Sequence, residues 1–203
     1  MKIDYRKEKL YSPPSEGCTI VDVPGMNFLM VDGRGNPNTS QQYKDALEAL
    51  YSLSYTIKFM IKKGEKAVDY GMPPLEGLWW TDDASRFSME NKDGWNWTSM
   101  VMQPEFVTEE CVGKAIEQVK LKKGDQPGLS KLRFESYNEG LSAQIMHIGP
   151  YCAEGPTVEK LHLFIKGQGY NFNGKHHEIY LSDPRKAAPE KMKTIIRQPI
   201  VKK

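Results

Sequence analysis

The sequence has few of the residues that build redox or metal sites. Its three cysteines, Cys18, Cys111 and Cys152, are far apart, with no Cys-x-x-Cys pair and no spacing suited to zinc. Two of its four histidines, His176 and His177, are adjacent, so a strand would point them to opposite faces. We therefore expect reduced thiols, no bound metal and no cofactor.

Long apolar runs are also missing. No run approaches the roughly 20 residues that a membrane helix needs, and the opening MKIDYRKEKL lacks the apolar core of a signal peptide. The hydrophobic content of 39% is that of a globular protein, so we expect a soluble, cytoplasmic chain. The net charge of +2 argues against a general attraction to nucleic acid. From Pro184 onward seven Lys and Arg face one Glu, which favours a solvated basic tail.

Two common catalytic signatures are absent. The segment GRGNP contains Gly33 and Gly35, but neither GxxG nor GK[ST] follows, so it does not predict a nucleotide-phosphate loop. No G-x-S-x-G elbow occurs either. Nucleotide hydrolysis and serine-hydrolase chemistry therefore have no support in the sequence.

What is present is a periodic arrangement of helices and strands. The clearest helix runs from Thr39 to about Gly64, with Thr39 and Gln42 resembling a capping box. Two further helices are expected from about Thr108 to Lys122 and from about Glu154 to Lys166. Strands are expected at MNFLMVDG, LEGLWWT, WNWTSMVMQP, KLRFESY, LSAQIMHIG, HHEIYLSD and KMKTIIRQPI, with the fourth and fifth forming a hairpin.

Both halves of the chain read as strand, helix, strand, strand. This order predicts an α+β fold made of a tandem β-α-β-β repeat, with an antiparallel sheet, helices on one face and a ligand cleft between them. We expect one domain over residues 1–203. Its first repeat spans about 20–104, a connector helix about 105–124, and its second repeat about 130–200.

One carboxylate in a strand stands out. Alternation in HHEIYLSD places Glu178, Tyr180 and Ser182 on one face and the intervening residues on the other. Glu is rarely buried without a partner. Glu178 is therefore either an ordinary carboxylate on a solvent-exposed face or a desolvated, reactive group facing the helices.

The tryptophans are concentrated in two consecutive strands. All four lie there: Trp79, Trp80, Trp95 and Trp97. Trp79 and Trp80 point to opposite faces, whereas Trp95 and Trp97 share one. They either fill the core or form an aromatic wall that stacks a flat ligand. Tyr137 and Tyr151, near strand ends, either face a cleft or pack.

Two segments together resemble a known family. HIGPY, from His147 to Tyr151, and EIYLSDP, from Glu178 to Pro184, are similar to the two signatures of the GyrI-like small-molecule-binding family. This family is related in fold to the effector domains of multidrug-responsive transcription regulators. The resemblance covers about residues 20–200 and implies a cleft lined with aromatics, where Glu178 is the pocket carboxylate for bulky, aromatic or cationic compounds.

The resemblance also limits the possible functions. About two dozen residues precede the first family strand, too few for a helix-turn-helix, so no DNA-binding domain is expected in this chain. A haem-binding protein of the related fold is disfavoured because no histidine lies in an evident ligation motif.

Stand-alone members of the family include hydrolases that open the cyclopropane of DNA-alkylating natural products, using a tryptophan and a glutamate. The resemblance therefore implies a bacterial, xenobiotic-detoxifying hydrolase with Glu178, Trp80 and Tyr180 as catalytic residues. The expected ligand-binding residues are Trp79, Trp95, Trp97, Tyr137 and Tyr151. Two alternatives stay open: a sequestering protein without turnover, and a module that binds a protein partner, as the gyrase-inhibitory members do.

Overall fold

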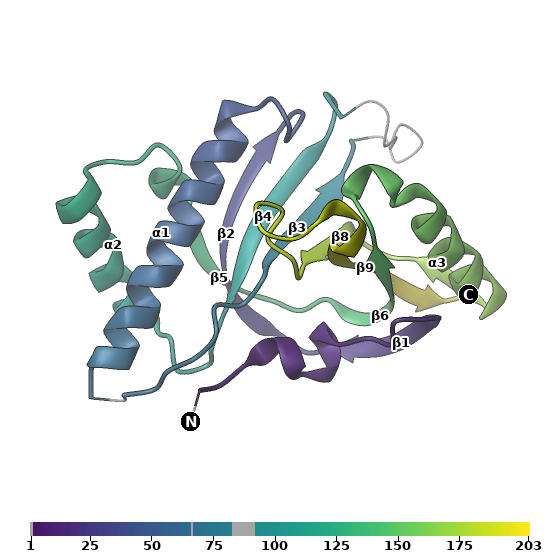
Figure 1. The fold of residues 1–203 in the computed structure, drawn as a ribbon, viewed down its shortest axis with the longest axis horizontal. Helices are drawn as coiled ribbons and strands as arrows, with labels where there is room; N and C mark the ends of the chain where they lie inside the picture. Colours follow the sequence, from purple (N-terminus) through teal and green to yellow (C-terminus); the bar gives the residue numbers. More distant parts are fainter. Residues whose placement is uncertain (1, 66, 83–91) are drawn as a thin grey trace. The chain divides into compact units, whose positions relative to one another are not determined.

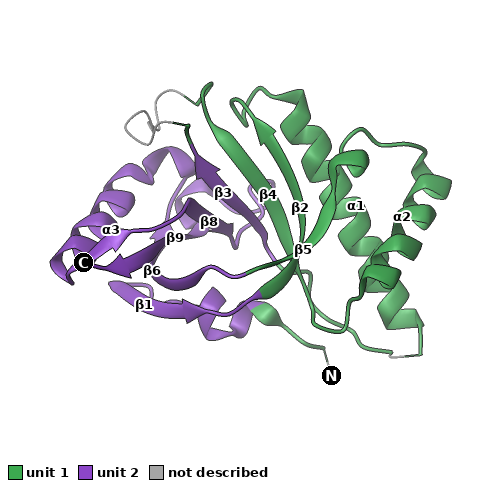
Figure 2. Ribbon diagram, turned by 180° about the vertical axis from the view of Figure 1, so that it is seen from behind, with its two compact units in different colours: residues 1–5, 26–73, 81–137 green, residues 6–25, 74–80, 138–203 purple. Residues whose placement is uncertain are grey.

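The computed structural model describes residues 2–65, 67–82 and 92–203, and the chain forms two compact units (Figures 1 and 2). The first unit comprises Met1–Tyr5, Met26–Pro73 and Thr81–Tyr137, and the second comprises Arg6–Gly25, Pro74–Trp80 and Asn138–Lys203. The units do not coincide with the two halves of the sequence, because two strands of the first half belong to the second unit. The expected single domain and its repeat boundaries remain predictions.

The first unit is a three-stranded antiparallel sheet with two helices. Its strand order is β5-β2-β4, where β2 is Met26–Arg34, β4 is Asn96–Gln103 and β5 is Arg133–Tyr137. Its helices are α1, Gln41–Lys63, and α2, Glu109–Lys123. Helix α1 contacts β2, β4 and α2 (Figure 1).

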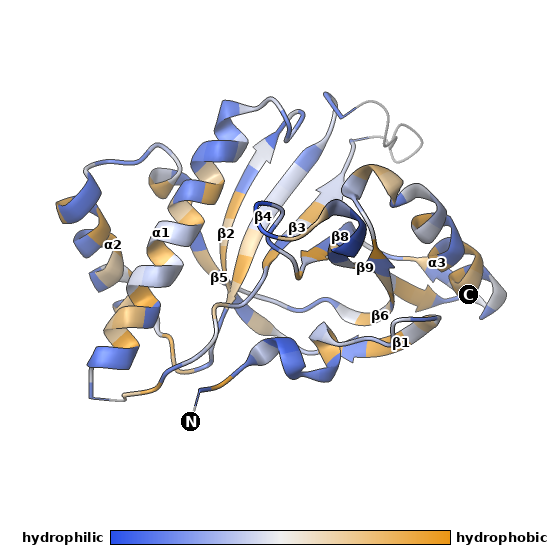
Figure 3. Cartoon of the chain, in the orientation of Figure 1, coloured by the Kyte–Doolittle hydropathy of each residue, from blue (hydrophilic) through white to orange (hydrophobic). Residues whose placement is uncertain are grey.

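Helix α1 forms because its apolar residues recur every three or four positions. The buried residues are Ala46, Ala49, Leu50, Leu53, Ser54, Ile57 and Ile61. The alternation of orange and blue along its ribbon reflects this pattern (Figure 3). The Ser40 hydroxyl accepts from the Tyr43 amide at 3.2 Å, so the N-cap is Ser40 and the expected cap at Thr39 is wrong. The helix ends at Gly64 as predicted.

The second unit is a larger antiparallel sheet with one helix. Its strand order is β1-β6-β9-β8-β3, and the short β7 pairs with β9. The strands are β1 (Cys18–Val23), β3 (Leu75–Trp80), β6 (Gly140–Ile148), β7 (Tyr170–Phe172), β8 (His176–Tyr180) and β9 (Lys193–Lys202). The helix α3 spans Gly155–Gly167.

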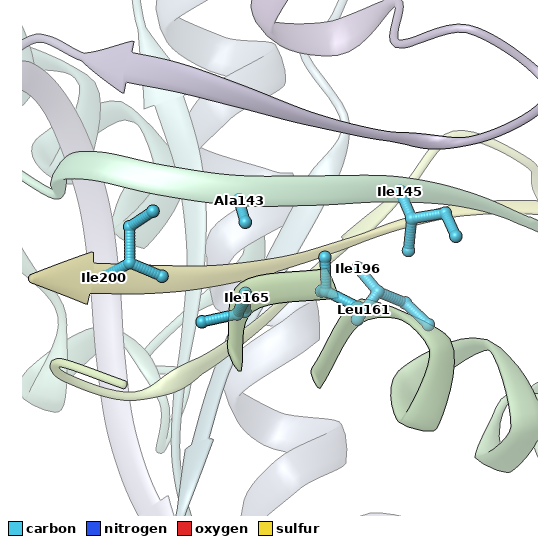
Figure 4. Packing of buried hydrophobic residues seen from close by; sticks show 6 residues of the cluster. All are labelled: Ala143, Ile145, Leu161, Ile165, Ile196 and Ile200. Carbon is cyan, nitrogen blue, oxygen red and sulfur yellow. The ribbon is translucent and has the colours of Figure 1, made fainter. Parts of the chain in front are cut away.

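Helix α3 packs on one face of this sheet. Leu161 and Ile165 of α3 form a buried cluster with side chains of β6 and β9 (Figure 4): Ala143, Ile145, Ile196 and Ile200. The opposite face carries Ile179 and Ile195, which pack with Tyr11 from the 3-10 turn η2, Lys9–Tyr11. Both faces are therefore covered within this unit.

The predicted α+β class and antiparallel pairing are confirmed. The first half contains the expected order β2-α1-β3-β4, and the second half contains β6-α3-β8-β9 with the short β7 inserted after α3. The expected hairpin of KLRFESY and LSAQIMHIG is wrong, because β5 pairs with β2 and β6 pairs with β1 and β9. Strands β1 and β7 were not expected. None of the helices that the structure describes has the length and hydropathy of a transmembrane span.

The basic end of the chain is only partly the solvated tail expected from its composition. Half of it forms β9, whose residues Thr194 to Ile200 are buried. Arg197 within it is fully buried. Pairing with carboxylates explains this burial, as described below.

Candidate functional site

Strand β8 places Glu178 on the face that α3 covers. In the register, Glu178 lies opposite Gly77 of β3 on one side and Ile196 of β9 on the other, and Ile196 belongs to the cluster packed against α3. Residues directly opposite in an antiparallel pair share a face. Glu178 is 5% exposed, so the alternative of an ordinary surface carboxylate is wrong.

Both carboxylate oxygens of Glu178 have a partner. The Tyr180 hydroxyl donates to Oε2 at 2.7 Å, and His176 Nε2 lies 3.1 Å from Oε1. His176 donates this hydrogen bond when Nε2 carries the proton. The three side chains alternate along β8 onto one face, as the sequence predicted for Glu178 and Tyr180. These two contacts fix the orientation of the carboxylate.

Trp79 extends this arrangement onto β3. Its indole Nε1 donates to the Tyr180 hydroxyl oxygen at 3.2 Å, so Trp79, Tyr180 and Glu178 form a chain of hydrogen bonds. A Cβ atom on Gly77 would lie 2.7 Å from Trp79 Nε1. The missing side chain at Gly77 therefore allows the indole to lie across β3 toward Tyr180.

The HIGPY segment fixes the turn from β6 into α3. His147 Nδ1 is 2.9 Å from the Thr157 hydroxyl in the first turns of α3, and its Nε2 is 3.3 Å from the Pro150 carbonyl. Gly149 has φ of +142°, which favours glycine. The turn brings the half-buried Tyr151 edge-on to Tyr180, with ring centroids 5.4 Å apart.

The opposite face of the same strands carries a buried ionic network. His177 Nδ1 lies 2.9 Å from Glu139 Oε1, and Arg197 Nη1 lies 3.1 Å from Glu139 Oε2. His177 Nε2 is 3.0 Å from Glu76 Oε2, an ion-pair distance without the alignment of a hydrogen bond. The Tyr11 hydroxyl donates to Glu76 Oε1 at 2.8 Å.

The charges of this network compensate one another. Burial lowers the pKa of His177, but Glu139 and Glu76 outweigh burial and raise the pKa to about 9. Burial raises the pKa of Glu139, but His177 and Arg197 outweigh it and lower the pKa below its usual value. Burial, and then Glu76, raise the pKa of Tyr11 well above its usual value. Two carboxylates thus meet two cations, as expected of a structural network.

The structure brings four of the expected site residues together: Glu178, Tyr180, Trp79 and Tyr151. Trp80 lies elsewhere, because consecutive residues of β3 point to opposite faces. The Lys175 ammonium is 3.4 Å from the centre of the Trp80 ring. Of the two adjacent tryptophans, Trp79 is the one connected to Glu178.

The other expected ligand-binding aromatics belong to the first unit. Trp97 is fully buried and meets Tyr43 of α1 edge-on, with ring centroids 5.0 Å apart. Trp95 is 1% exposed, and Tyr137 meets Phe28 edge-on at 6.3 Å. These contacts are typical of core packing. A role of Trp95, Trp97 and Tyr137 in ligand binding remains a prediction.

Sequence reasoning missed His176 as a partner of Glu178. It stands two residues before Glu178, so the alternation of the strand placed it on the same face and was a sufficient signal. Glu76, Glu139 and Arg197 carried no such signal, because long-range strand pairing brings them together. Among the described residues, no group of three or more His, Cys, Asp or Glu is placed to hold a metal ion.

Small-molecule sites are lined mainly by apolar and aromatic side chains with a few polar groups, and the Glu178 cluster has this composition. Residues 17–201 match the GyrI-like small molecule binding domain, and the chain belongs to this family. No curated protein matches the chain significantly.

Several solved structures are similar over nearly the whole chain. An uncharacterised conserved protein from Listeria innocua is 44% identical, with a TM-score of 0.90, covering 98% of this chain and 100% of the other. A hydrolase from Listeria innocua is 43% identical, with a TM-score of 0.88, covering 99% and 100%. The C-terminal domain of EcmrR is 11% identical, with a TM-score of 0.57 over 92% and 98%, and shares the fold alone.

Proposed function

We propose that this protein is a hydrolase of bulky, planar, hydrophobic compounds, and that it detoxifies them by opening a strained cyclopropane conjugated to a dienone. The observation that carries the proposal is the carboxylate of Glu178, buried on the α3 face and held by Tyr180 and His176. The similar proteins from Listeria innocua that are described as hydrolases, 43% and 44% identical, support the choice of a hydrolase.

Glu178 acts in this proposal as a general base. A water molecule on the carboxylate loses a proton to Glu178 while its oxygen forms a bond to a cyclopropane carbon. A general base in the correct position contributes about two to four orders of magnitude in rate. Because Tyr180 and His176 fix the carboxylate, its orientation toward this water is set before the substrate binds.

The electrons and protons of the step balance without any further reactant. As the C–O bond forms, one C–C bond of the cyclopropane breaks, and its electron pair moves into the dienone. The carbonyl oxygen gains negative charge and takes up the proton that Glu178 accepted, directly or through water. The product is the substrate plus one water molecule.

The aromatic residues position the carboxylate and the ring system. The Tyr180 hydroxyl donates a hydrogen bond to Glu178 and accepts one from Trp79, so its role in this proposal is to orient Glu178. To donate a hydrogen bond to a ligand carbonyl instead, the Tyr180 hydroxyl would have to turn away from Glu178. In this proposal Trp79, and not Trp80, is the tryptophan that acts together with Glu178, because Trp79 donates a hydrogen bond to Tyr180. Tyr151 offers a ring face or edge for a flat ligand.

Turnover of a spirocyclopropyl dienone of the duocarmycin type tests the proposal. The protein is supplied at about one hundredth of the substrate concentration, and ring-opened product is followed by mass spectrometry, with Glu178→Gln in parallel. We expect many equivalents of product from the wild type and a rate at least about 100-fold lower from the variant. Glu159→Gln, the same substitution at an exposed carboxylate of α3, is the control and should retain the wild-type rate.

The same assay separates the proposal from the alternatives. Loss of at most one equivalent of compound, without ring-opened product, would identify a sequestering protein and contradict the hydrolase. Equal rates for the wild type and Glu178→Gln would show that Glu178 is not the general base. If the protein neither binds the compound nor turns it over, the assignment of this substrate class is wrong.

A further inference from the structure

A second potential binding site lies on the first unit, between α1 and α2. The two helices pack side by side (Figures 1 and 2) and leave a groove of about 730 Å³. The groove is lined by residues of these helices and by the glycine after α1: Glu48, Tyr51, Ser52, Tyr55, Thr56, Phe59, Met60, Lys63, Gly64, Gln118, Lys122 and Lys123. None of these residues belongs to the Glu178 cluster.

The floor of the groove is an aromatic stripe along α1. Tyr51, Tyr55 and Phe59 follow one another at intervals of four residues, so they lie on one face of the helix over about 12 Å. Their exposed fractions are 38%, 46% and 49%, and the rings of Tyr55 and Phe59 are stacked with centroids 6.4 Å apart. Three large rings exposed in a row on one helix are unusual for a surface that stays in water.

The shape of the groove favours a macromolecule over a small ligand. Small-molecule sites enclose most of the ligand surface, whereas rings exposed by more than a third line an open surface. Lys123 donates to Ser52 of α1 at 2.9 Å, and Gln126, after α2, donates to the earlier Glu48 at 2.8 Å, so the helices run in opposite directions. The groove thus follows the helix axes, and such grooves accept the apolar face of another helix.

The charges at the two ends of the groove are mainly positive. Lys122 and Lys123 lie at one end, and Lys63 lies at the other end of α1. Glu48, the acidic residue of the lining, accepts a hydrogen bond from Gln126 at 2.8 Å. Lys63 and Lys122 are exposed and form no salt bridge within the described residues. The apolar stripe is therefore flanked by cations that complement an anionic partner.

We infer that the α1–α2 groove is a docking surface for an acidic amphipathic helix of a partner protein. Apolar side chains of that helix would cover Tyr51, Tyr55 and Phe59, and its acidic side chains would meet Lys63 and Lys122. The site is distinct from the residues proposed for hydrolysis, so a partner can bind this protein without using Glu178.

Two designed peptides test this inference on the full chain. Both have about 15 residues, long enough for about 22 Å of helix, with leucine at every fourth position. One carries glutamate on its flanks and the other carries lysine. Fluorescence anisotropy of the labelled peptides should show saturable binding of the glutamate peptide, at least tenfold tighter than that of the lysine peptide. Binding should weaken as salt increases.

Variants locate the binding. Phe59→Ala should lower the affinity for the glutamate peptide at least fivefold. Lys122→Glu combined with Lys63→Glu should make the lysine peptide bind more tightly than the glutamate peptide. Leu163→Ala is the matched control, because Leu163 is an apolar residue of α3 that is 64% exposed; it should leave binding unchanged. All these variants should retain the wild-type melting temperature and the turnover of the wild type.

Three results would overturn the inference. The first is no saturable binding of the glutamate peptide, and the second is equal binding of both peptides or binding indifferent to Phe59→Ala. The third is concentration-dependent dimerisation that Phe59→Ala abolishes, which would show that a second copy of this chain occupies the groove.

Discussion

Two neighbouring residues of β8, His177 and Glu178, belong to two different polar clusters on opposite faces of the strand. On the face of His177, two carboxylates and two cations are buried together and neutralise one another. On the face of Glu178, one carboxylate is held by a phenol and an imidazole. The first arrangement neutralises its own charges, whereas the second orients one buried carboxylate, which is the group proposed as the base.

The comparison shows why burial alone does not identify a functional carboxylate. Glu76 and Glu139 are as buried as Glu178, but fixed cations lie next to them. A carboxylate beside a guanidinium is a poor base because the charged form is stabilised. This difference supports the proposal that the His177 face contributes to stability and the Glu178 face to chemistry.

The largest expected effect on stability comes from Arg197. Arg197→Met removes the guanidinium from Glu139 and also loses hydrogen bonds to Gln144, at 3.0 Å, and to the Leu10 carbonyl, at 2.7 Å. Breaking a buried pair in this way costs about 3–5 kcal/mol of the free energy of unfolding, measured by urea denaturation. Arg185→Met removes an exposed guanidinium and should leave the midpoint nearly unchanged. A similar shift for both variants would contradict a structural role of the network.

The next largest effect is the dependence of stability on pH. The pKa of His177 is raised from 6.5 to about 9, so the folded state binds the proton more tightly than the unfolded state. This stabilisation is complete below about pH 6.5 and is lost as the pH rises through about 9, by roughly 3 kcal/mol. Since the pKa of Glu139 is lowered from 4.5, its contribution is present above that value and is lost as the pH falls through its folded pKa.

Chemical denaturation between pH 6 and pH 9.5 measures the effect of His177. In His177→Gln the decline over this range should largely disappear, although the variant is less stable at pH 6. The control His162→Gln should keep the decline. A wild-type curve that is flat between pH 6.5 and 9 would show that His177 is not held as a cation.

The smallest of these effects concerns the support of Glu178. Gly77→Ala introduces a Cβ atom 2.7 Å from Trp79 Nε1, which displaces the indole from Tyr180. The loss of one hydrogen bond of ~1 kcal/mol predicts a decrease in turnover of about fivefold, together with a change in tryptophan fluorescence. Gly155→Ala is the control, because nothing lies within 4 Å of its Cβ position. Unchanged fluorescence and turnover in Gly77→Ala would show that Trp79 does not support Glu178 through Tyr180.

Local patterns in the sequence predicted much of this structure. The apolar period of α1 and the alternation in HHEIYLSD are local properties, so the helix and the two faces of β8 followed from them. The pairing of β5 with β2 instead of β6 did not, because two strands close in sequence can each find a distant partner. The unexpected β7 is only three residues long, too short for a pattern.

The candidate site was predictable to a similar extent. Glu178 and Tyr180 followed from alternation and from the resemblance to the family, and His176 could have been found in the same way. The choice between Trp79 and Trp80 required the register of β3 against β8, which pairs Trp79 with His176. The burial of Arg197 could not be predicted from the composition of the C-terminal segment, because it depends on Glu139, 58 residues away.

The most direct test of the division compares Glu178→Gln with Glu139→Gln, two substitutions of the same chemistry on opposite faces of one sheet. Product formation from the spirocyclopropyl dienone and the melting temperature are measured on the same samples. We expect Glu178→Gln to lose at least about 100-fold in rate with a melting temperature close to that of the wild type. We expect Glu139→Gln to melt at a lower temperature while its folded fraction keeps the wild-type rate. Full turnover by Glu178→Gln, or a rate loss in Glu139→Gln without loss of stability, would contradict the account.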